Sequence, residues 1–561
     1  MKRPSWLTSS QMIIAGLVFC LVSTGAAVLW ALSLYNSLSN YRSPLSDHVP
    51  QPGAALGQPA TRKIVFVLID ALRLDTSLQA ATMPTLNQLR QQGASAVMHS
   101  RPPSYSEPGY STLLIGAWPA LNGGPAVNRD YTDIPTWTQD NLFSAAQRVG
   151  LRTAVSGYNW FEKLIPQSAV DIHFYTPGED QLADQDVVAA ALPWLDQKFG
   201  LVLIHIDQVD YAGHHEGGFR SPGWAAAAKR SDKLLAAILA RVDLTKDTIF
   251  VCSDHGQIDA GGHGGTEPVV LTEPWVLAGA GVKPGQYGDV NMVDVAPTLA
   301  ALLGANLPAI TQGQVRQEML ILSAGTLSAL PGAAQTQQTQ LVATYTKAID
   351  HALAGDQMPQ GSAVPVYQQA LEQTVNDRLY LERVPRWLTA GFVLLLIVGL
   401  LSRLKRRTLA WVYGGALLSQ VIFHAIYSLI EGHPYSMSWV PGIFGLIMDI
   451  GLLTAISLTA GWLLTLSGLG AFHQSRSAAV QISLGYLLAV FSLLLLPIGV
   501  HYAKNGALVT WIVPDMQFFY IGLMALVQLC LSAILGMLLS GLAALAVRKP
   551  GAAGRSGVAL P

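Results

Sequence analysis

The stretch "KIVFVLID" (residues 63–70) is an apolar run that ends in an aspartate. Every residue between the first lysine and that aspartate is apolar, so both faces of a strand formed here would be apolar. The run therefore predicts a strand that is buried on both faces. Such strands are typical of parallel sheets with helices on each side. Four other segments have strand character: "LRTAVSG" (151–157), "LVLIHID" (201–207), "TIFVCSD" (248–254) and "PWVLAG" (274–279).

Helical patterns lie between these strands. "MPTLNQLRQQG" (83–93) is amphipathic and stops at Gly93. Residues 222–241 follow Ser221, and a proline in the first turn is typical of a helix start. Strands that alternate with helices predict a mostly parallel sheet between two helical layers, so the predicted fold class is α/β with a three-layer α/β/α domain.

Three of the predicted strands end in acidic residues. Asp70 ends the first, Asp207 or Asp210 ends the strand that begins at 201, and Asp254 ends the strand that begins at 248. In open α/β sheets, ligands bind at the carboxyl ends of the strands. A single aspartate there is often a helix cap. Three of them, two followed closely by histidine, predict a metal site instead.

The composition indicates a membrane protein with a soluble part. Of 561 residues, 51% are hydrophobic and only 12% are charged, whereas ordinary soluble domains have about 25% charged residues. The net charge of −1 gives no support to nucleic acid as a partner. Cys20, Cys252 and Cys530 are too far apart to indicate a disulfide framework or a paired-cysteine zinc site.

Long apolar stretches divide the chain. Residues 11–35 are too long for the core of a cleaved signal peptide and predict a transmembrane anchor. From Leu38 to about Pro385, no segment is long and apolar enough to span a bilayer. Five C-terminal spans are predicted, of which the third and the last are overlong and therefore tilted or interrupted: 387–403, 408–430, 438–468, 477–500 and 515–546.

Basic residues predict the topology of these six spans. Lys2 and Arg3, "SRLKRRT" (402–408) and "VRKPGAAGR" (547–555) all fall on one side, which is the cytoplasmic side by the positive-inside rule. The α/β domain is then extracytoplasmic, in a multi-pass protein of the cell membrane. The predicted parts are a cytoplasmic N-terminus (1–10), the anchor (11–35), a linker (36–62), the α/β domain (63–330), a helical juxtamembrane connector (331–385), five transmembrane helices (386–546) and a cytoplasmic tail (547–561).

Histidines complete the candidate metal site. "DYAGH" places Asp210 and His214 one turn apart if the segment is helical, and "SDHGQIDAGGHGG" (253–265) supplies His255 and His263. Oxygen and imidazole ligands without thiolate suit Zn²⁺ or Mn²⁺. With the aspartates there are enough ligands for two divalent metal ions, which at about 4 Å apart would clamp the attacking and leaving oxygens of a phosphoryl transfer.

A nucleophile candidate lies in "RPPSYSEPGYSTLLIG" (101–116). Pro108 fits the first turn of a helix, which places Ser106 at the helix N-terminus, where phosphate is favoured. A metal ion at the Ser106 oxygen would favour its alkoxide. The alternative is that Ser106 is only an N-cap.

Four segments together resemble the alkaline phosphatase superfamily over about residues 63–285: "KIVFVLIDALR", "SEPGYSTLLIG", "DYAGH" and "SDHGQIDAGGHGG". Type I phosphodiesterases/nucleotide pyrophosphatases and glycosylphosphatidylinositol ethanolamine-phosphate transferases look nearest. The transferases also have an N-terminal anchor, an extracytoplasmic catalytic domain and a polytopic C-terminal half. Their nucleophile region has a hydroxyl residue followed two positions later by Pro-Gly, like Ser106, Pro108 and Gly109 here.

The resemblance implies an alkaline-phosphatase-like fold and a role for each matched residue. Ser106 is the implied catalytic nucleophile, and Asn128 resembles the phosphate-contacting asparagine of the phosphodiesterases, at an offset of about one residue. The implied ligands are Asp70, Ser106, Asp254 and His255 for one metal, and Asp210, His214 and His263 for the other.

Some residues depart from the family pattern or have simpler interpretations. Tyr110 stands where sulfatases need arginine, which argues against sulfate-ester hydrolysis, and Asn122 replaces a histidine common in phosphodiesterases. Strand alternation predicts that His205 and Asp207 face away from Asp210 and are structural. The remaining assignments are a turn role for Asp259, a solvated or helix-terminal role for Glu107, and a functional or interfacial role for His424 and Asp449 inside predicted spans.

The sequence therefore favours a membrane-bound two-metal phosphotransferase or phosphodiesterase with a serine nucleophile. Its substrate would be a phosphoethanolamine-type group on a phospholipid or lipid-linked glycan. One alternative is a nucleotide pyrophosphatase/phosphodiesterase that acts on soluble substrates. An alternative of another class is a non-catalytic membrane assembly or transport protein with a metal-binding domain, which would have no need of Ser106.

Overall fold

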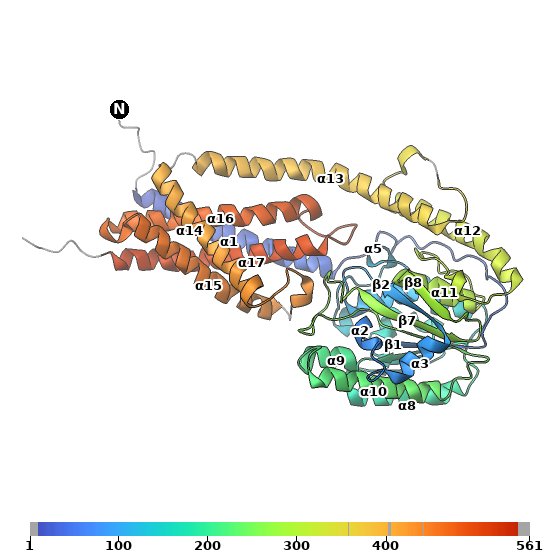
Figure 1. Cartoon of the computed structure of the whole chain (residues 1–561). Helices are drawn as coiled ribbons and strands as arrows, with labels where there is room; N and C mark the ends of the chain where they lie inside the picture. Colours follow the sequence, from blue (N-terminus) through green and yellow to red (C-terminus); the bar gives the residue numbers. More distant parts are fainter. Residues whose placement is uncertain (1–8, 357, 402–404, 441–442, 548–561) are drawn as a thin grey trace, which may run out of the picture.

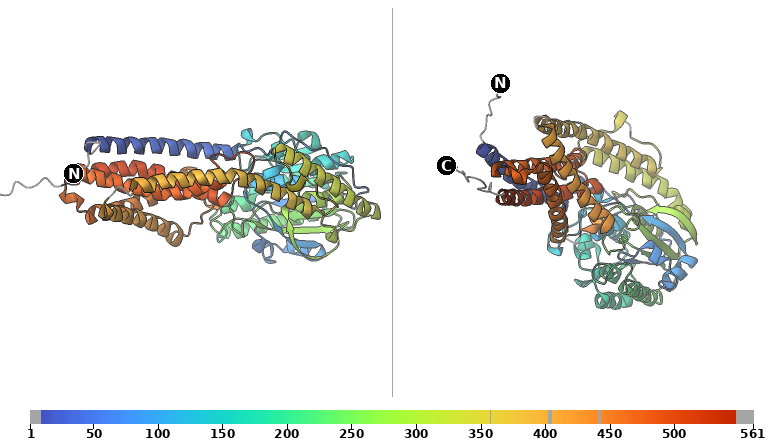
Figure 2. Two further views of the ribbon diagram at one scale, coloured as in Figure 1. Left: turned by 90° about the horizontal axis from the view of Figure 1, so that it is seen from above. Right: turned by 60° about the vertical axis from the view of Figure 1, so that its left-hand side comes forward.

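An α/β domain lies at one end of a bundle of long helices (Figures 1 and 2). The computed structural model describes residues 9–356, 358–401, 405–440 and 443–547. Most of the basic residues that predicted the topology lie outside these ranges; Lys405, Arg406 and Arg407 are described.

A mixed sheet of eight strands forms the centre of the α/β domain, in the order β4-β3-β5-β1-β6-β7-β2-β8. The strands from β4 to β6 in this order are parallel, whereas β7 is antiparallel to both of its neighbours. The prediction of a mostly parallel sheet is confirmed. The strand bounds are β1 Ile64–Ile69, β2 Ala94–His99, β3 Thr153–Tyr158, β4 Ile172–Thr176, β5 Leu201–Ile206, β6 Thr248–Cys252, β7 Thr272–Gly279 and β8 Gly285–Asn291.

The sequence did not predict β2, β4 and β8. The edge strands β4 and β8 are mostly exposed or half-buried, and β2 is only partly buried. Such strands lack the long apolar runs that identify central strands from sequence.

Helices cover both faces of the sheet, as predicted. Alternate side chains of β1 enter two separate cores: Phe66 packs in one and Val67 in the other. The first core includes residues of α4 (Ser106–Ile115), α6 (Leu142–Arg148) and α11 (Val295–Leu302). The second includes residues of α3 (Pro84–Gln92), α8 (Gln181–Leu195) and α10 (Pro222–Leu239), which lie on the lower side of the domain in Figure 1. Shorter helices are α2 (Leu74–Ser77), α5 (Pro119–Asn122), α7 (Phe161–Leu164) and α9 (Gln208–His215).

Two helices join the α/β domain to the bundle. α12 (Ala324–Ala348) lies on the α/β domain, and α13 (Val364–Leu401) runs from there along the bundle as one continuous helix (Figure 2). The last part of the predicted connector, from Val364 on, and the first C-terminal span therefore belong to the same helix, which continues across residue 385. The last residues of that span, 402–403, lie outside the described residues.

The membrane helices agree with most of the predicted spans. Within the described ranges, five helices are long and apolar enough to cross a membrane: Ile13–Ser39, Arg406–Ile430, Phe444–Gly468, Arg476–Asn505 and Met516–Ala546. They belong to α1 (Ser9–Ser39), α14 (Arg406–His424) with the π-helix Ala425–Ile430, α15 (Ile443–Gly468), α16 (Arg476–Asn505) and α17 (Met516–Ala546). The predicted span 438–468 is shorter than expected, because residues 437–439 form a separate 3₁₀ turn.

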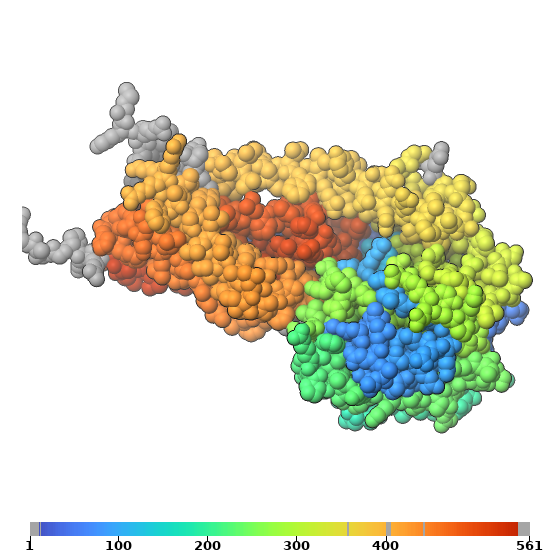
Figure 3. Space-filling model, viewed as in Figure 1, coloured from blue at the N-terminus to red at the C-terminus, as the bar shows by residue number. Residues whose placement is uncertain are grey.

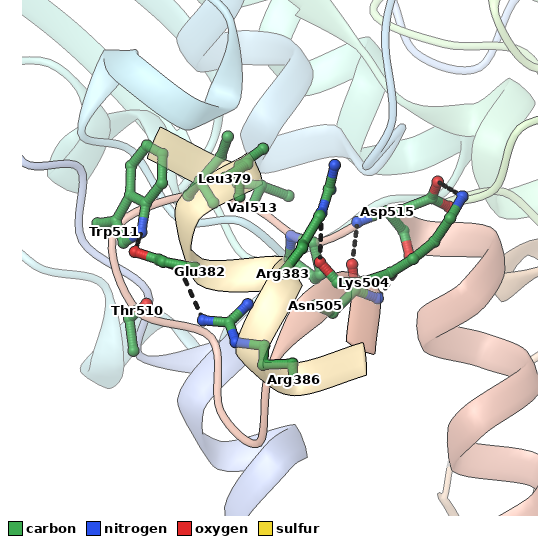
Figure 4. Close-up of a pocket in the computed structure, with 12 residues that line it drawn as sticks. Leu379, Glu382, Arg383, Arg386, Lys504, Asn505, Thr510, Trp511, Val513 and Asp515 are labelled. Atoms are coloured by element: carbon green, nitrogen blue, oxygen red, sulfur yellow. Dashed lines mark hydrogen bonds and ion pairs between the residues drawn. The ribbon is translucent and has the colours of Figure 1, made fainter. Parts of the chain in front are cut away.

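A polar cluster fixes α13 against the bundle where it leaves the α/β domain (Figure 4). Glu382 on α13 accepts hydrogen bonds from Arg386 (2.7 Å) and from the indole N–H of Trp511 (2.9 Å). Arg383 donates to the backbone carbonyl of Lys504 (3.0 Å), the last turn of α16. These contacts tie α13 to α16 and to the loop that precedes α17.

We expect Gly415→Ala to destabilise the bundle, because α14 and α15 touch backbone to backbone there. A Cβ at Gly415 would lie 2.4 Å from the carbonyl oxygen of Gly461 and 2.1 Å from the Thr465 hydroxyl. Overpacking of this kind costs about 1–3 kcal/mol. The thermal midpoint of the detergent-solubilised protein should fall by several degrees. Gly414→Ala is the matched control, since a Cβ there meets nothing within 4 Å; equal midpoints for the two variants would contradict this packing.

Candidate active site

The order of the central strands brings three aspartates together. β5, β1 and β6 are parallel neighbours, so their carboxyl ends share one edge of the sheet. Asp70 and Asp207 directly follow β1 and β5, and Asp254 follows β6 after one residue. All three side chains are buried. The predicted meeting of strand-end aspartates is confirmed in the geometry.

α9 positions two further candidate ligands. It begins right after Asp207, so Asp210 and His214 lie one helical turn apart, as predicted. Asp184 on α8 holds the start of this helix, because its carboxylate accepts hydrogen bonds from the backbone N–H groups of Asp207 (2.8 Å) and Gln208 (3.0 Å). These are among the N–H groups that a helix start leaves without a partner.

One candidate metal set consists of Asp210, His214 and His263, whose donor atoms all lie within 4.8 Å of one another. His263 Nε2 is 3.0 Å from His214 Nε2 and 3.6 Å from Asp210 Oδ1. The chain can bring His263 so close because Gly261 packs on Gly213 of α9: a Cβ at Gly261 would lie 1.8 Å from the Gly213 carbonyl oxygen. The glycines of this loop are thus needed for the approach of the two histidines.

A second set lies beside the first and shares Asp210. Donor atoms of Asp70, Asp210 and His255 fall within 4.8 Å of one another. Asp254 belongs to the same group, since its Oδ2 is 3.2 Å from His255 Nε2. Asp70 Oδ1 and Asp254 Oδ2 are buried and have no hydrogen-bond partner among the described residues.

The electrostatics of these buried groups fit bound cations. Burial and the nearby charge of Asp210 raise the pKa of Asp70 well above its usual range, and burial with the charge of Asp70 does the same for Asp254. Burial lowers the pKa of His263 to about 4, so its imidazole is neutral and able to bind metal at neutral pH. Carboxylates with unsatisfied oxygens, packed against neutral imidazoles, suit divalent ions such as Zn²⁺ or Mn²⁺.

Ser106 lies at the edge of the second set, at the start of α4. Its Oγ is 3.2 Å from His255 Nε2 and 3.5 Å from the amide nitrogen of Asn128. The cap residue of α4 is Tyr105, and the Ser106 side chain makes no capping hydrogen bond. The geometry therefore contradicts the simple N-cap alternative. Asn128 is held in place because its Oδ1 accepts from the backbone N–H of Glu107 (3.1 Å).

Some neighbours of the site have surroundings that the sequence did not predict. Strand alternation cannot relate the direction of the His205 side chain to that of Asp210, because Asp210 lies on α9 and not on the strand. His205 Nε2 is 3.2 Å from Asp70 Oδ2 and 2.9 Å from the Tyr110 hydroxyl, which also donates to Asp70. His205, Asp207 and Asp70 even form a third set with metal-ligand spacing. A histidine inside an otherwise apolar strand was the available signal.

Glu107 lies in the first turn of α4, which agrees with the second of its two predicted roles, the helix-terminal one. It is fully buried beside Ser106 instead of solvated. One carboxylate oxygen accepts from the backbone N–H of Arg129 (3.1 Å), and the other has no described partner. Asp259, by contrast, lies outside the candidate ligand sets, as predicted. It forms ion pairs with Arg73 (2.9 Å) and Arg220 (2.7 Å).

The site also has a contribution from the bundle that the sequence did not predict. A cavity of about 180 Å³ is lined by His214 and His263 on one side and by Ser438 and Trp439 on the other. These last two residues precede α15, in a segment that the sequence assigned to a transmembrane span.

Comparison with known proteins places this site in a family. The profile described as type I phosphodiesterase/nucleotide pyrophosphatase matches residues 64–360, more than half of the chain. The chain belongs to the type I phosphodiesterase/nucleotide pyrophosphatase family. The resemblance to the alkaline phosphatase superfamily and the predicted three-layer α/β/α fold with a separate helical membrane region are thereby confirmed.

Several relatives within this family are transferases. The catalytic subunit of human GPI ethanolamine phosphate transferase 2 is 27% identical over 298 residues, which cover 47% of this chain and 29% of the relative. GPI ethanolamine phosphate transferase 2 of Yarrowia lipolytica is 24% identical over 330 residues, covering 53% and 38%. The chain thus spans about a third of the length of these relatives. The chain is a multi-pass membrane protein, because it has several helices that are long and apolar enough to cross a membrane and its relatives are ethanolamine phosphate transferases.

Two solved structures give lower similarities. An alkaline phosphatase superfamily protein from Vibrio parahaemolyticus has 16% sequence identity and a TM-score of 0.37, covering 48% of this chain and 73% of that one. Human ectonucleotide pyrophosphatase/phosphodiesterase 5 has 16% identity and a TM-score of 0.35, covering 43% and 95%.

We expect His263→Ala to lose one of two bound metal equivalents, because His263 closes the set with Asp210 and His214. Asp259→Ala is the matched control from the same glycine loop; its carboxylate is committed to two arginines. Metal content after dialysis against Zn²⁺ and gel filtration can be measured by inductively coupled plasma mass spectrometry. Loss of the same amount of metal in both variants would contradict the assignment.

The raised pKa of the buried Glu107 carboxyl predicts that the stability of the folded protein depends on pH. Burial raises its pKa from the ordinary 4.5 to about 8, so the folded protein keeps this proton over a range where the unfolded chain has lost it. This contribution to stability is complete below about pH 4.5 and is lost as the pH rises toward 8. Glu107→Gln cannot ionise, so the thermal midpoint of the metal-free variant should fall less than that of the metal-free wild type between pH 5 and pH 8. Parallel midpoint curves would contradict the assignment.

Proposed function

We propose that the protein is a membrane-bound, metal-dependent phosphotransferase or phosphodiesterase with Ser106 as its nucleophile. The group transferred is of the phosphoethanolamine type, on a phospholipid or lipid-linked glycan. The observation that carries the proposal is the position of Ser106 Oγ, at a helix N-terminus, 3.2 Å from His255 and beside Asn128. The ethanolamine phosphate transferases among the relatives support the substrate class.

The proposed reaction has two steps, both at the oxygen of Ser106. Ser106 Oγ attacks phosphorus, the bond between phosphorus and the donor alcohol oxygen breaks, and the Ser106 proton goes to that oxygen. The product of this half is a phosphodiester of Ser106. A hydroxyl group of the acceptor, or water, then attacks the same phosphorus. The bond between phosphorus and Ser106 Oγ breaks, the phosphoethanolamine group passes to the attacking oxygen, and the proton of that oxygen goes to Ser106 Oγ.

Asn128 and the start of α4 bind the phosphate during both halves. The Asn128 amide donates toward the position of the reacting oxygens, and the N-terminus of α4 favours negative charge. Metal ions held by Asp70, Asp254 and His255, and by Asp210, His214 and His263, would add positive charge at the attacking and leaving oxygens. Gln257 positions Asp210, because its side-chain amide donates to that carboxylate.

The cavity beside the site supports a substrate at the membrane surface. His214 and His263 line it together with Ser438 and Trp439, which belong to the helical bundle. A soluble nucleotide diester has no need of a wall supplied by membrane helices. An extracytoplasmic position of the site, as the basic residues predict, is part of the proposal.

Ser106→Ala should lower turnover by about a thousandfold or more, since it removes the group that forms the covalent intermediate. Protein incubated with phosphatidylethanolamine labelled in the headgroup phosphate should give a labelled phosphoethanolamine diester at Ser106 in the wild type only. Chelation should stop turnover, and Zn²⁺ or Mn²⁺ should restore it.

Ser111→Ala is the matched control, because Ser111 is a buried serine of the same helix. Labelling that persists in Ser106→Ala would contradict the nucleophile. Turnover of a nucleotide diester with no turnover of labelled lipid would favour the soluble-substrate alternative.

A further inference from the structure

The segment 431–440, here called the membrane loop, lies between the π-helix after α14 and α15. It packs against the glycine-rich loop that contains Gly261, His263 and Gly265. Ser438 Oγ accepts from the backbone N–H of Gly265 (3.0 Å) and donates to Glu267 (2.7 Å). A Cβ at Gly265 would lie 1.8 Å from Ser436 Oγ, so the two loops are in close contact. In Figure 3 the orange surface of the bundle meets the green surface of the α/β domain.

The same loop lines a second cavity, inside the bundle. This cavity has a volume of about 370 Å³, and its polar lining residues are Gln420 and His424 on α14, Tyr435 on the membrane loop, and Gln528 on α17. The other lining residues are apolar, and none of them is lysine, arginine, aspartate or glutamate. Polar groups in a membrane bundle are costly and mark binding sites or pathways.

Two of these polar groups have no partner within the protein. Gln528 is only 2% exposed, lines the cavity, and makes no hydrogen bond to any described residue through its side chain. Gln420, one helical turn before His424, is half-buried and makes no side-chain hydrogen bond in the described part of the chain. The Tyr435 hydroxyl and His424 Nδ1 are 2.9 Å apart. A buried amide side chain without a partner is rare in native proteins, so the position of Gln528 beside a cavity points to a ligand.

The chemistry of the lining restricts the ligand. Amide, imidazole and phenol groups are neutral hydrogen-bond donors, and they suit neutral acceptors such as ester carbonyl oxygens. An anionic phosphate would find no positive side chain among them. Apolar residues of α16 and α17, among them Leu494 and Ile521, complete the walls and suit hydrocarbon.

We propose that this cavity binds the glycerol and ester region of a diacylglycerophospholipid, with the headgroup directed to Ser106. Tyr435 lines the inner cavity and Ser438, three residues later, lines the cavity at the candidate metal ligands. Three residues span at most about 10 Å, which is within reach of one phospholipid headgroup. The proposal deepens the proposed function, because it supplies the lipid-binding site for the same reaction centre.

The test measures lipid binding without turnover. Full-length protein carrying Ser106→Ala is purified in mild detergent and mixed with palmitoyl-oleoyl phosphatidylethanolamine or with its diether analogue, which lacks the ester carbonyls. Native mass spectrometry counts the lipids retained per protein. We expect the ester lipid to be retained about fivefold better than the diether lipid, since about 1 kcal/mol is the net contribution of one such hydrogen bond.

Gln528→Leu and Gln420→Leu, each made in this background, should remove that preference. Gln481→Leu is the matched control: Gln481 is another glutamine of a membrane helix whose amide nitrogen is buried and unpartnered, but it does not line the cavity. Equal retention of ester and diether lipid by the parent protein, or an unchanged preference in both glutamine variants, would overturn the proposal. Preferential retention of a polyprenyl phosphate or a sterol, added in competition, would overturn the assignment of a glycerophospholipid.

These outcomes are separate from those for the proposed function. If wild-type protein turns over labelled lipid but shows no ester preference, the lipid pocket is wrong and the nucleophile stands. If no phosphodiester is turned over but the ester preference and its loss in Gln528→Leu are observed, the pocket stands and the catalytic proposal fails.

Discussion

The mutual repulsion of buried carboxylates is the constraint on which the α/β domain depends. The order β5-β1-β6 brings Asp70, Asp207 and Asp254 to one edge of the sheet, and α9 adds Asp210. No lysine or arginine is hydrogen-bonded or ion-paired to any of these four carboxylates within the described ranges. Such a group is stable only with cations or protons between its members. The fold therefore requires positive charge at the edge of the sheet where β5, β1 and β6 end. Ser106 lies next to this group of carboxylates, beside His255.

The sequence predicted the centre of this arrangement better than its edges. The apolar run of β1 and the aspartates after the central strands follow from burial, which leaves a strong pattern. The edge strands β4 and β8 are partly solvated and leave none. The proximity of His205 to Asp70 was not predicted, because β5 ends at Ile206 and Asp210 lies on α9, where the alternation of strand side chains no longer applies.

The role of the membrane loop could not be predicted, because its residues look like the start of an apolar span. Ser438 contacts Gly265 and Glu267, which are distant in sequence, and together with Trp439 it lines the cavity at the candidate metal ligands. Local composition carries no information on such contacts. The same holds for Gln528, whose meaning depends on the cavity that α14, α16 and α17 enclose around it.

The unbroken course of α13 has a mechanical consequence. A single helix of 38 residues is about 57 Å long at 1.5 Å per residue, and the contacts of Glu382 with Arg386 and Trp511 tie it to the bundle beside the α/β domain. The height of the catalytic centre above the bilayer is then set by how deeply the bundle sits. Where a membrane of different thickness tilts the helices, α13 would pass that tilt on to the α/β domain and to the candidate site that it holds.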